Sequence, residues 1–429
     1  MAVIKAFKGL RYTEKSGDIG KLCCPPYDII DERQRQELLD KNPCNLIRLE
    51  LPVVGGSEDA EAYRSAGDTL RSWLKDGILK RDDKECLYIY EMEFSALSKN
   101  HSVKGFVSQV KLEPFSRGVI LPHEETLSKA KTDRFNLMKI TGCNFSQIYS
   151  LYTDSDGSVF ELIEKASSSA PDSEFTDGDG VTHRMWCVSD ETVVKAVCEK
   201  MADKKLYIAD GHHRYETALN YQKYVRDSLD EIGSSDYVPM MLVNMENSGL
   251  VVFPTHRIVR DLPEYDFKAV CERCEEYFEV TPYLNREKGE RGLEEAYSKG
   301  EKAFVLFSGD NNYTLLKLRD LSVMNSLLPD DCEALRQLDV SVLHTLVLER
   351  IFGIDKENMA KQINLTYTRS ADEAISAVDG KRANCCFLLN PTRVEEIREV
   401  AAAGGKMPQK STYFYPKLTT GLVMNKIFN

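Results

Sequence analysis

One short run of the sequence concentrates residues that can do chemistry. In LYIADGHHRYETAL, residues 206–219, an apolar segment is followed by Asp210, Gly211, His212, His213 and Arg214. The apolar segment predicts a strand and the glycine a turn, and the apolar spacing after it predicts a helix. A helix N-terminus has unpaired N–H groups and about half a positive charge. The run therefore predicts a phosphate-binding turn.

The roles of three residues follow from this geometry. Gly211 would let a ligand approach the backbone, and Arg214 would clamp phosphate oxygens. Asp210 repels a polyphosphate unless a cation stands between them, so its functional interpretation is a Mg²⁺ ligand. The alternative is an N-cap, which contributes about 1 kcal/mol. The two interpretations differ in one testable respect, which is whether phosphate binding requires a metal ion.

The adjacent histidines point in different directions, because successive residues on a helix lie about 100° apart. His212 and His213 are therefore not expected to chelate one metal ion. We expect one of them to face the ligand and the other to pack or form a hydrogen bond beneath the turn.

A second polar cluster lies in residues 121–142, LPHEETLSKAKTDRFNLMKITG. It is either a charged loop that caps a helix, with Thr132 as N-cap, or a functional segment. In the functional interpretation Glu124 or Glu125 is a general base or metal ligand. The basic residues that would steer phosphate are Lys131 and Arg134.

Three further segments combine polar and aromatic residues. MPQKSTYFYPK, residues 407–417, contains Lys410 and fits a lid, a phosphate-contacting loop or an aromatic docking segment. PPYDII, residues 25–30, fits a rigid turn. FPTHRIV, residues 253–259, places His256 and Arg257 at a strand bend.

The composition excludes several classes of protein. A net charge of −12 disfavours nucleic acid and anionic membranes as partners. The first residues lack the features of a secretion signal, and no apolar run approaches the length of a membrane span. The twelve scattered cysteines are then best explained as free thiols, with Cys271 and Cys274 on one helix surface. We expect a cytoplasmic protein.

Both helices and strands are expected to position these segments. Hydrophobic periodicity predicts strands that come in groups separated by helices, which indicates an α+β fold. Residues 303–318 predict a hairpin, and residues 95–101 predict a hairpin loop. Residues 284–302 predict a solvated helix. The Ser- and Asp-rich residues 167–180 predict an insertion or mobile loop.

The segments PPYDII, PHEET with KTDRFNLM, ADGHHRYETA, FPTHRIV and MPQKSTYFYPK together resemble a bacterial and archaeal family, domain of unknown function 1015. More distantly, ADGHHRYETAL is similar to the phosphate box of the ParB/sulfiredoxin-like fold, which includes free serine kinases. That resemblance implies nucleotide and Mg²⁺ contacts for residues 210–214. It also implies Glu124 as the base that activates the acceptor hydroxyl. The cysteine of sulfiredoxins and the basic helices of ParB proteins have no counterpart here.

These observations predict a central ParB/sulfiredoxin-like mixed domain over residues 105–260, with an insertion near 154–180. It is flanked by α/β additions, residues 1–104 and 261–429. The leading hypothesis is a Mg²⁺-dependent kinase that uses ATP or ADP and acts on a small hydroxylated metabolite such as serine. The predicted site residues are Glu124 and His212 for catalysis, Asp210 for metal, and Gly211, His212, His213, Arg214, Lys131, Arg134 and Lys410 for the nucleotide phosphates.

Two other functions fit the same residues. A nucleotide-binding regulatory module would bind nucleotide without turnover of a small molecule. A metal-dependent hydrolase would use His123, Asp210, His212 and His256 and would hold Zn²⁺ or Mn²⁺. The sequence leaves the acceptor, the nucleotide and the oligomeric state open.

Overall fold

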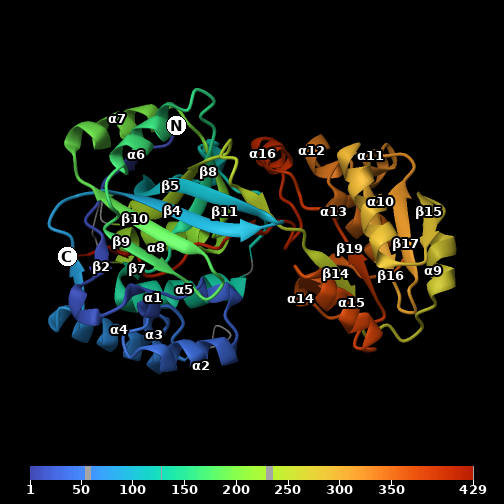
Figure 1. The fold of residues 1–429 in the computed structure, drawn as a ribbon, viewed down its shortest axis with the longest axis horizontal. Coiled ribbons are helices and arrows are strands. Elements are labelled where there is room, and N and C mark those ends of the chain that lie inside the picture. Colours follow the sequence, from blue (N-terminus) through green and yellow to red (C-terminus); the bar gives the residue numbers. More distant parts are fainter. Residues whose placement is uncertain (54–58, 127, 229–234, 429) are drawn as a thin grey trace. The chain divides into compact units, whose positions relative to one another are not determined.

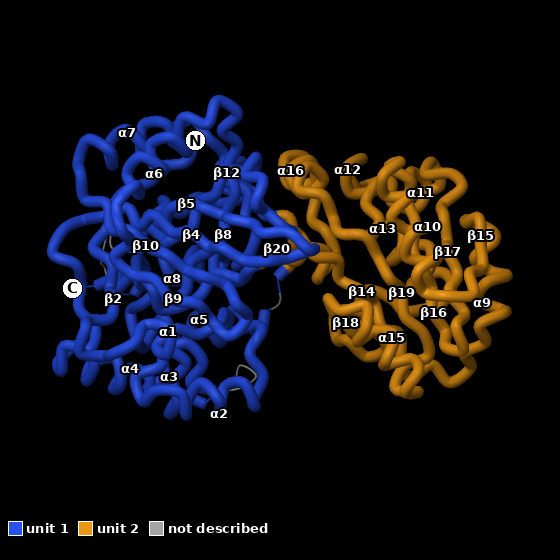
Figure 2. The backbone as a smooth tube through the Cα atoms, viewed as in Figure 1, with its two compact units in different colours: residues 1–122, 126–251, 416–429 blue, residues 123–125, 252–415 orange. Residues whose placement is uncertain are grey.

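The structure is a computed structural model that describes residues 1–53, 59–126, 128–228 and 235–428. The chain forms two compact units. Unit 1 comprises residues 1–122, 126–251 and 416–429, and unit 2 comprises residues 123–125 and 252–415 (Figure 2). The chain therefore passes between the units at four places, and two of them lie within the PHEET segment. The prediction of three consecutive regions, 1–104, 105–260 and 261–429, stays a prediction about how the chain is divided.

Unit 1 is built on a mixed sheet in the order β6-β11-β8-β12-β5-β4-β10-β9, with β1 paired to β5. Most neighbours are antiparallel, but β11 and β6 are parallel, as are β12 and β8. The strands are β1 Ile4–Lys5, β4 Leu87–Ala96, β5 Lys99–Lys111, β6 Ile120–Leu121, β8 Ile148–Tyr152, β9 Ser173–Thr176, β10 Thr182–Val188, β11 Leu206–Asp210 and β12 Tyr237–Asn244. The smaller pairs are β2 Leu10–Tyr12 with β3 Leu79–Arg81, and β7 Cys143–Asn144 with β21 Asn425–Lys426.

Hydrophobic clusters hold the helices of unit 1 in place. One cluster joins the large sheet to α6, α7 and α8, and another gathers α2, α3 and α4 beside strands β2 and β3 (Figure 1). The helices are α1 Ile19–Leu22, α2 Glu32–Lys41, α3 Ile47–Glu50, α4 Ala60–Lys75, α5 Ser128–Thr141, α6 Ser158–Ala166, α7 Glu191–Met201 and α8 His212–Ser228. Short 3₁₀ turns lie at Glu14–Ser16, Tyr27–Ile29 and Phe115–Arg117.

Unit 2 has an antiparallel sheet in the order β15-β17-β16-β19-β14-β18. The core on one face joins β16 and β19 to α10 and α15, and residues of the opposite face such as Phe304 and Phe387 are also buried. The strands are β13 Val251–Val252, β14 His256–Val259, β15 Phe278–Tyr283, β16 Ala303–Phe307, β17 Tyr313–Leu318, β18 Leu365–Thr368, β19 Cys385–Leu388 and β20 Phe414–Tyr415. The helices are α9 Phe267–Cys274, α10 Arg286–Ser298, α11 Val323–Leu327, α12 Glu333–Arg336, α13 Asp339–Val342, α14 Lys356–Lys361, α15 Ala371–Asp379 and α16 Val394–Ala402, with a π-helix over Leu343–Glu349.

The α+β class is confirmed, and so are both hairpins. Strands β16 and β17 enclose the predicted GDNN turn, and β4 and β5 meet at Leu97 and Ser98, both at positive φ. The predicted helix of residues 284–302 is α10. The prediction for residues 167–180 was wrong in part, because Ser173–Thr176 form β9 at the edge of the sheet, paired with β10. The sequence did not predict β9 because its composition is polar: few of its residues point inward, and its outer side is solvated.

No helix in the described part of the chain is long and apolar enough to cross a membrane. The twelve cysteines are free, and Cys271 and Cys274 lie on α9 as expected.

Candidate functional site

The run at residues 206–219 folds as strand, turn and helix. Strand β11 ends at Asp210, Gly211 has a φ of +95°, and α8 begins at His212. The helix is anchored by Tyr215, which is fully buried, donates to the carbonyl of Glu113 at 2.7 Å and stacks on Phe115. The predicted geometry is therefore present in unit 1, with the helix N-terminus directly after the buried strand.

The carboxylate of Asp210 is bonded to two cations. The Nη2 atom of Arg214 lies 2.5 Å from Oδ2, and the Nζ atom of Lys417 donates to Oδ1. Burial opposes ionisation of Asp210, but Lys417 and Arg214 outweigh it and hold the pKa of this carboxyl well below its usual range. Asp210 is therefore ionised, and the two cations leave one positive charge in excess.

The structure shows a close approach of Arg214 to Gly211. A Cβ atom at this position would lie 2.9 Å from Nε and 3.0 Å from Cζ of Arg214. The missing side chain thus makes room for the guanidinium of Arg214, which folds back over the turn. Arg214 also donates to the carbonyl of Gln147. The positive φ and the close approach both require glycine here.

The two histidines of the turn differ in burial. His212 is 6% exposed, whereas His213 is half-buried. Which of the two histidines faces a ligand stays a prediction. The proximity of His212 is among the influences that lower the pKa of Asp210.

Arg134 lies in a buried ionic network on α5. Its guanidinium bonds to Asp133 at 2.6 Å and lies 3.5 Å from the carboxylate of Glu50, and the ring of Tyr27 lies 4.0 Å from its Cζ atom. The hydroxyl of Tyr63 donates to Asp133 at 2.5 Å. The PPYDII and KTDRFNLM segments are thus brought together, and the charge of Arg134 is balanced inside the fold.

Glu50 is the acidic group that faces Arg214 from α3. It is 2% exposed and accepts from the hydroxyl of Ser146 at 2.8 Å. Burial raises the pKa of Glu50, against the opposing effects of Arg134, Ser146 and Arg214. Glu50, Ser146 and Arg214 all line a cavity of about 390 Å³ in unit 1. Sequence analysis missed Glu50, because a glutamate in NLIRLEL reads as a helix surface residue.

Lys131 and Thr132 also lie on α5. Lys131 forms an ion pair with Glu216 of α8 at 2.7 Å, so it joins the two helices. Thr132 is not the N-cap, because α5 includes Ser128 and the hydroxyl of Thr132 donates to the Ser128 carbonyl. The prediction was wrong because the apolar period begins one turn after the helix does.

The other predicted site residues belong to unit 2. His123 is fully buried and its Nε2 atom lies 3.1 Å from Oγ1 of Thr412. Glu124 forms a β-bridge with Met407, and Met407 donates its N–H to the carbonyl of His123. The PHEET and MPQKSTYFYPK segments are therefore paired. Lys410 is exposed at positive φ.

The described donors around Asp210 do not form a ready metal site. The described residues contain no group of three or more His, Cys, Asp and Glu side chains placed to hold a metal ion. Both oxygens of Asp210 are already bonded, and Lys417 occupies the position that the sequence argument gave to a metal cation. Asp210 could join Mg²⁺ only by releasing Lys417.

Fold and site together define a mixed α+β protein with a cationic turn between a buried strand and a helix. The chain belongs to the family described as "Protein of unknown function (DUF1015)", whose model matches residues 4–341. No curated protein matches the sequence.

Several solved structures are similar to this chain. A conserved hypothetical protein from Pyrococcus furiosus is 17% identical, with 71% of this chain and 93% of that chain covered and a TM-score of 0.34. A free serine kinase in complex with AMP is 15% identical, with 71% and 89% covered and a TM-score of 0.36. SbnI with C-terminal truncation from Staphylococcus aureus is 11% identical, with 75% and 87% covered and a TM-score of 0.36. These scores are too low for the likenesses to decide an activity.

Proposed function

We propose that unit 1 binds the phosphate groups of a nucleotide at the N-terminus of α8. One observation carries this proposal: two cations, Arg214 and Lys417, share the single carboxylate of Asp210 directly beside that helix end. The excess positive charge and the helix dipole both favour an anion. Glu50 offsets part of this charge, although the rise in its pKa by burial weakens that effect.

A bound phosphate would replace an existing partner of Arg214 or Lys417 rather than occupy an empty site. A phosphate oxygen can take the place of one Asp210 oxygen on Arg214 or Lys417, since guanidinium and ammonium groups bind phosphate as well as carboxylate. The resemblance of ADGHHRYETAL to the phosphate box of free serine kinases supports the same role. The assignment of a ParB/sulfiredoxin-like domain to residues 105–260 belongs to this proposal.

The proposed reaction is phosphoryl transfer to a small hydroxylated metabolite. The acceptor oxygen bonds to the phosphorus atom, the nucleotide leaves with the electrons of the broken P–O bond, and the hydroxyl proton passes to a base. Such transfers depend mainly on positioning and on neutralising charge. Glu124 is the proposed base. Whether Mg²⁺ accompanies the nucleotide, as the sequence predicts, is part of the test.

Calorimetry of the full chain with ATP, ADP and AMP, each with Mg²⁺ or with EDTA, tests the binding step. We expect Arg214→Gln to weaken nucleotide binding about tenfold or more, since a charged hydrogen bond contributes about 1.5–3 kcal/mol. Arg226→Gln on the same helix is the matched control, because Arg226 is half exposed and pairs with Asp236. Equal affinity of Arg214→Gln and wild type contradicts the proposal.

The transfer step needs its own assay. The protein is incubated with ATP or ADP and a panel of amino acids and polyols, and phosphorylated product is measured. Acceptor-dependent product, reduced in Glu124→Gln and retained in Glu125→Gln, supports a kinase with Glu124 as base. Nucleotide binding without any product would instead indicate the regulatory module.

A further inference from the structure

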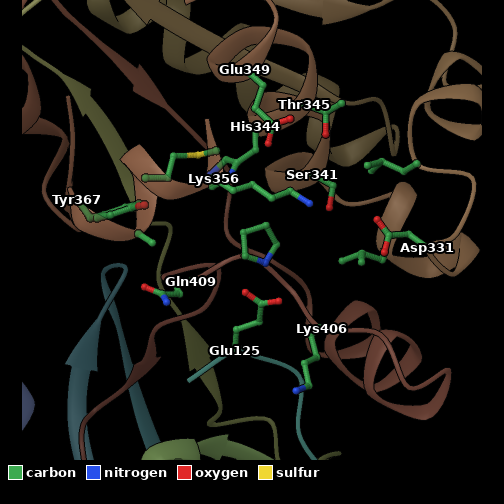
Figure 3. A pocket seen from close by; sticks show the side chains of 15 residues that line it. Glu125, Asp331, Ser341, His344, Thr345, Glu349, Lys356, Tyr367, Lys406 and Gln409 are labelled. Atoms are coloured by element: carbon green, nitrogen blue, oxygen red, sulfur yellow. The ribbon is translucent and has the colours of Figure 1, made fainter. Parts of the chain in front are cut away.

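Unit 2 contains a cavity that the proposed nucleotide site does not use. Its empty volume, with the open mouth included, is about 820 Å³. Glu125, Ser341, His344, Lys356 and Tyr367 are among the residues that line it. Figure 3 shows Ser341 and Lys356 directed into the same part of the cavity, with His344 nearby and Glu125 on the opposite wall.

A fully buried arginine lies behind this cavity. Arg257 is 0% exposed, and among the described residues no carboxylate lies within ion-pair distance of it. Its neighbours are the carbonyl of Thr255, the imidazole of His344 and the ring of Tyr367. Burial lowers the pKa of Arg257 to about 10, although Tyr367 and the more distant charge of Glu124 act against this. A buried cation without a carboxylate partner is costly and is stabilised by an incoming anion.

His344 lines the cavity and contacts Arg257 behind it. Both Nε and Nη2 of Arg257 lie 3.3 Å from Nε2 of His344. Because a guanidinium only donates, Nε2 accepts and the imidazole proton is on Nδ1. Burial and Arg257 lower the pKa of His344, which keeps the ring neutral. Nδ1 has no hydrogen-bond partner among the residues that the structure describes, so it is a donor available to a ligand.

A second donor lies one turn away on the same helical segment. Ser341 is 4% exposed, and its hydroxyl has no hydrogen-bond partner in the described chain. Ser341 and His344 are three residues apart, so both can face the same space. The segment from Leu343 to Glu349 is a π-helix, a rare form that recurs at functional sites. A buried hydroxyl without a partner costs about 1–3 kcal/mol, which a bound ligand can recover.

We propose that this cavity binds a small carboxylate-bearing metabolite, with the carboxylate accepting from Ser341 and from Nδ1 of His344. Arg257 is a positioning residue that fixes the histidine tautomer. Three acidic residues of the lining, Glu125, Asp331 and Glu349, outnumber its two lysines, Lys356 and Lys406, which disfavours a phosphate dianion and leaves a carboxylate to accept an ammonium group. Apolar residues such as Leu335 and Met359 complete the lining. Neutral amino acids therefore belong to the expected ligand class. This proposal is independent of the nucleotide site.

The test uses the full chain and four probes: acetate, isovalerate, L-valine and inorganic phosphate. Each is titrated by calorimetry and by thermal unfolding. We expect L-valine or isovalerate to bind and to raise the Tm, and phosphate to bind more weakly. Ser341→Ala should lower the affinity about tenfold, since a hydrogen bond to a charged group is lost. Ser298→Ala, at the exposed end of α10, should bind as wild type.

The stability of the variants separates binding from a structural role. Ser341→Ala removes a hydroxyl without a partner, so the Tm of the ligand-free protein should be unchanged or higher. Arg257→Met should abolish carboxylate binding while nucleotide binding stays as in wild type. The proposal is overturned if no carboxylate binds at millimolar concentration, if phosphate binds more tightly than all three carboxylates and loses this affinity in Ser341→Ala, or if Ser341→Ala binds the carboxylates as wild type does.

Discussion

The ammonium group of Lys417 donates to the carboxylate of Asp210, although the two residues are separated by 207 positions in the sequence. The C-terminal segment of unit 1 thereby supplies a cation to the turn between β11 and α8. Asp210, which would repel a phosphate by itself, is neutralised by side chains of this chain. The requirement for a cation, which the sequence argument assigned to Mg²⁺, is met in this structure by a lysine.

Replacement of Lys417 by methionine should change both affinity and metal dependence. The variant keeps the length of the side chain but removes its charge, so we expect nucleotide affinity to fall about tenfold. Binding should then depend more strongly on Mg²⁺, because Asp210 has lost one of its two cations. Calorimetry with Mg²⁺ and with EDTA measures both effects. Lys195→Met, on the exposed side of α7, is the comparison, and equal Mg²⁺ dependence in Lys417→Met and wild type would refute the role given to Lys417.

The sequence predicted local structure well where residue composition and hydrophobic periodicity indicate the same element. Strand β11, the turn at Gly211 and the beginning of α8 follow from an apolar run, a glycine and helical spacing. The hairpin at Leu97 and Ser98 was found from its flanking strands, although neither turn residue is one that favours positive φ. Edge strand β9 was missed because a solvated strand lacks the apolar period on which prediction depends.

Contacts between residues that are far apart in the chain could not be predicted from the sequence. Nothing around Lys417 indicates Asp210 as its partner, and nothing around Glu50 indicates that it is buried beside Arg134. The polar segments also divide between the units in a way that spacing does not reveal. PPYDII, KTDRFNLM and ADGHHRYETA lie in unit 1. The paired segments around His123 and Met407, together with FPTHRIV, lie in unit 2.

Gly211→Ala should damage the phosphate-binding turn. The added Cβ atom meets the guanidinium of Arg214 at 2.9–3.0 Å, and φ is +95°. We expect a loss of stability of about 1–3 kcal/mol and weaker nucleotide binding. Gly118→Ala is the control, because Gly118 also has a positive φ but its added Cβ would meet no atom within 4 Å. If both variants bind nucleotide equally, the close approach of Arg214 does not matter for binding.

Removal of Arg134 should destabilise unit 1 strongly. Arg134→Met leaves Asp133 and Glu50 buried without their cation, and breaking a buried pair in this way costs about 3–5 kcal/mol. Urea unfolding followed by tryptophan fluorescence measures the loss, since Trp73 and Trp186 both belong to unit 1. Arg64→Met, on the exposed side of α4, should change stability by less than about 0.5 kcal/mol. Similar stabilities of the two variants would contradict this account of the network.

His256 should make unit 2 sensitive to acid. Burial, Arg257 and Arg286 lower its pKa from 6.5 to about 4, and its Nδ1 atom accepts from the N–H of Leu389. The unfolded chain therefore binds the proton at a higher pH than the folded chain, so stability falls as the pH decreases from about 6.5 towards 4. A shift of this size corresponds to about 3 kcal/mol.

Asp339 acts in the opposite direction over part of this range. Burial raises its pKa to about 6, so its contribution to stability is present at low pH and is lost as the pH rises from about 4 to 6. His256→Asn should therefore reduce the loss of stability below pH 6.5, while the effect of His344, which acts in the same direction, and the opposing effect of Asp339 remain. Differential scanning calorimetry between pH 4 and 7 measures this, with His101→Asn in unit 1 as control. A profile for His256→Asn that matches wild type would show that His256 does not titrate as its burial requires.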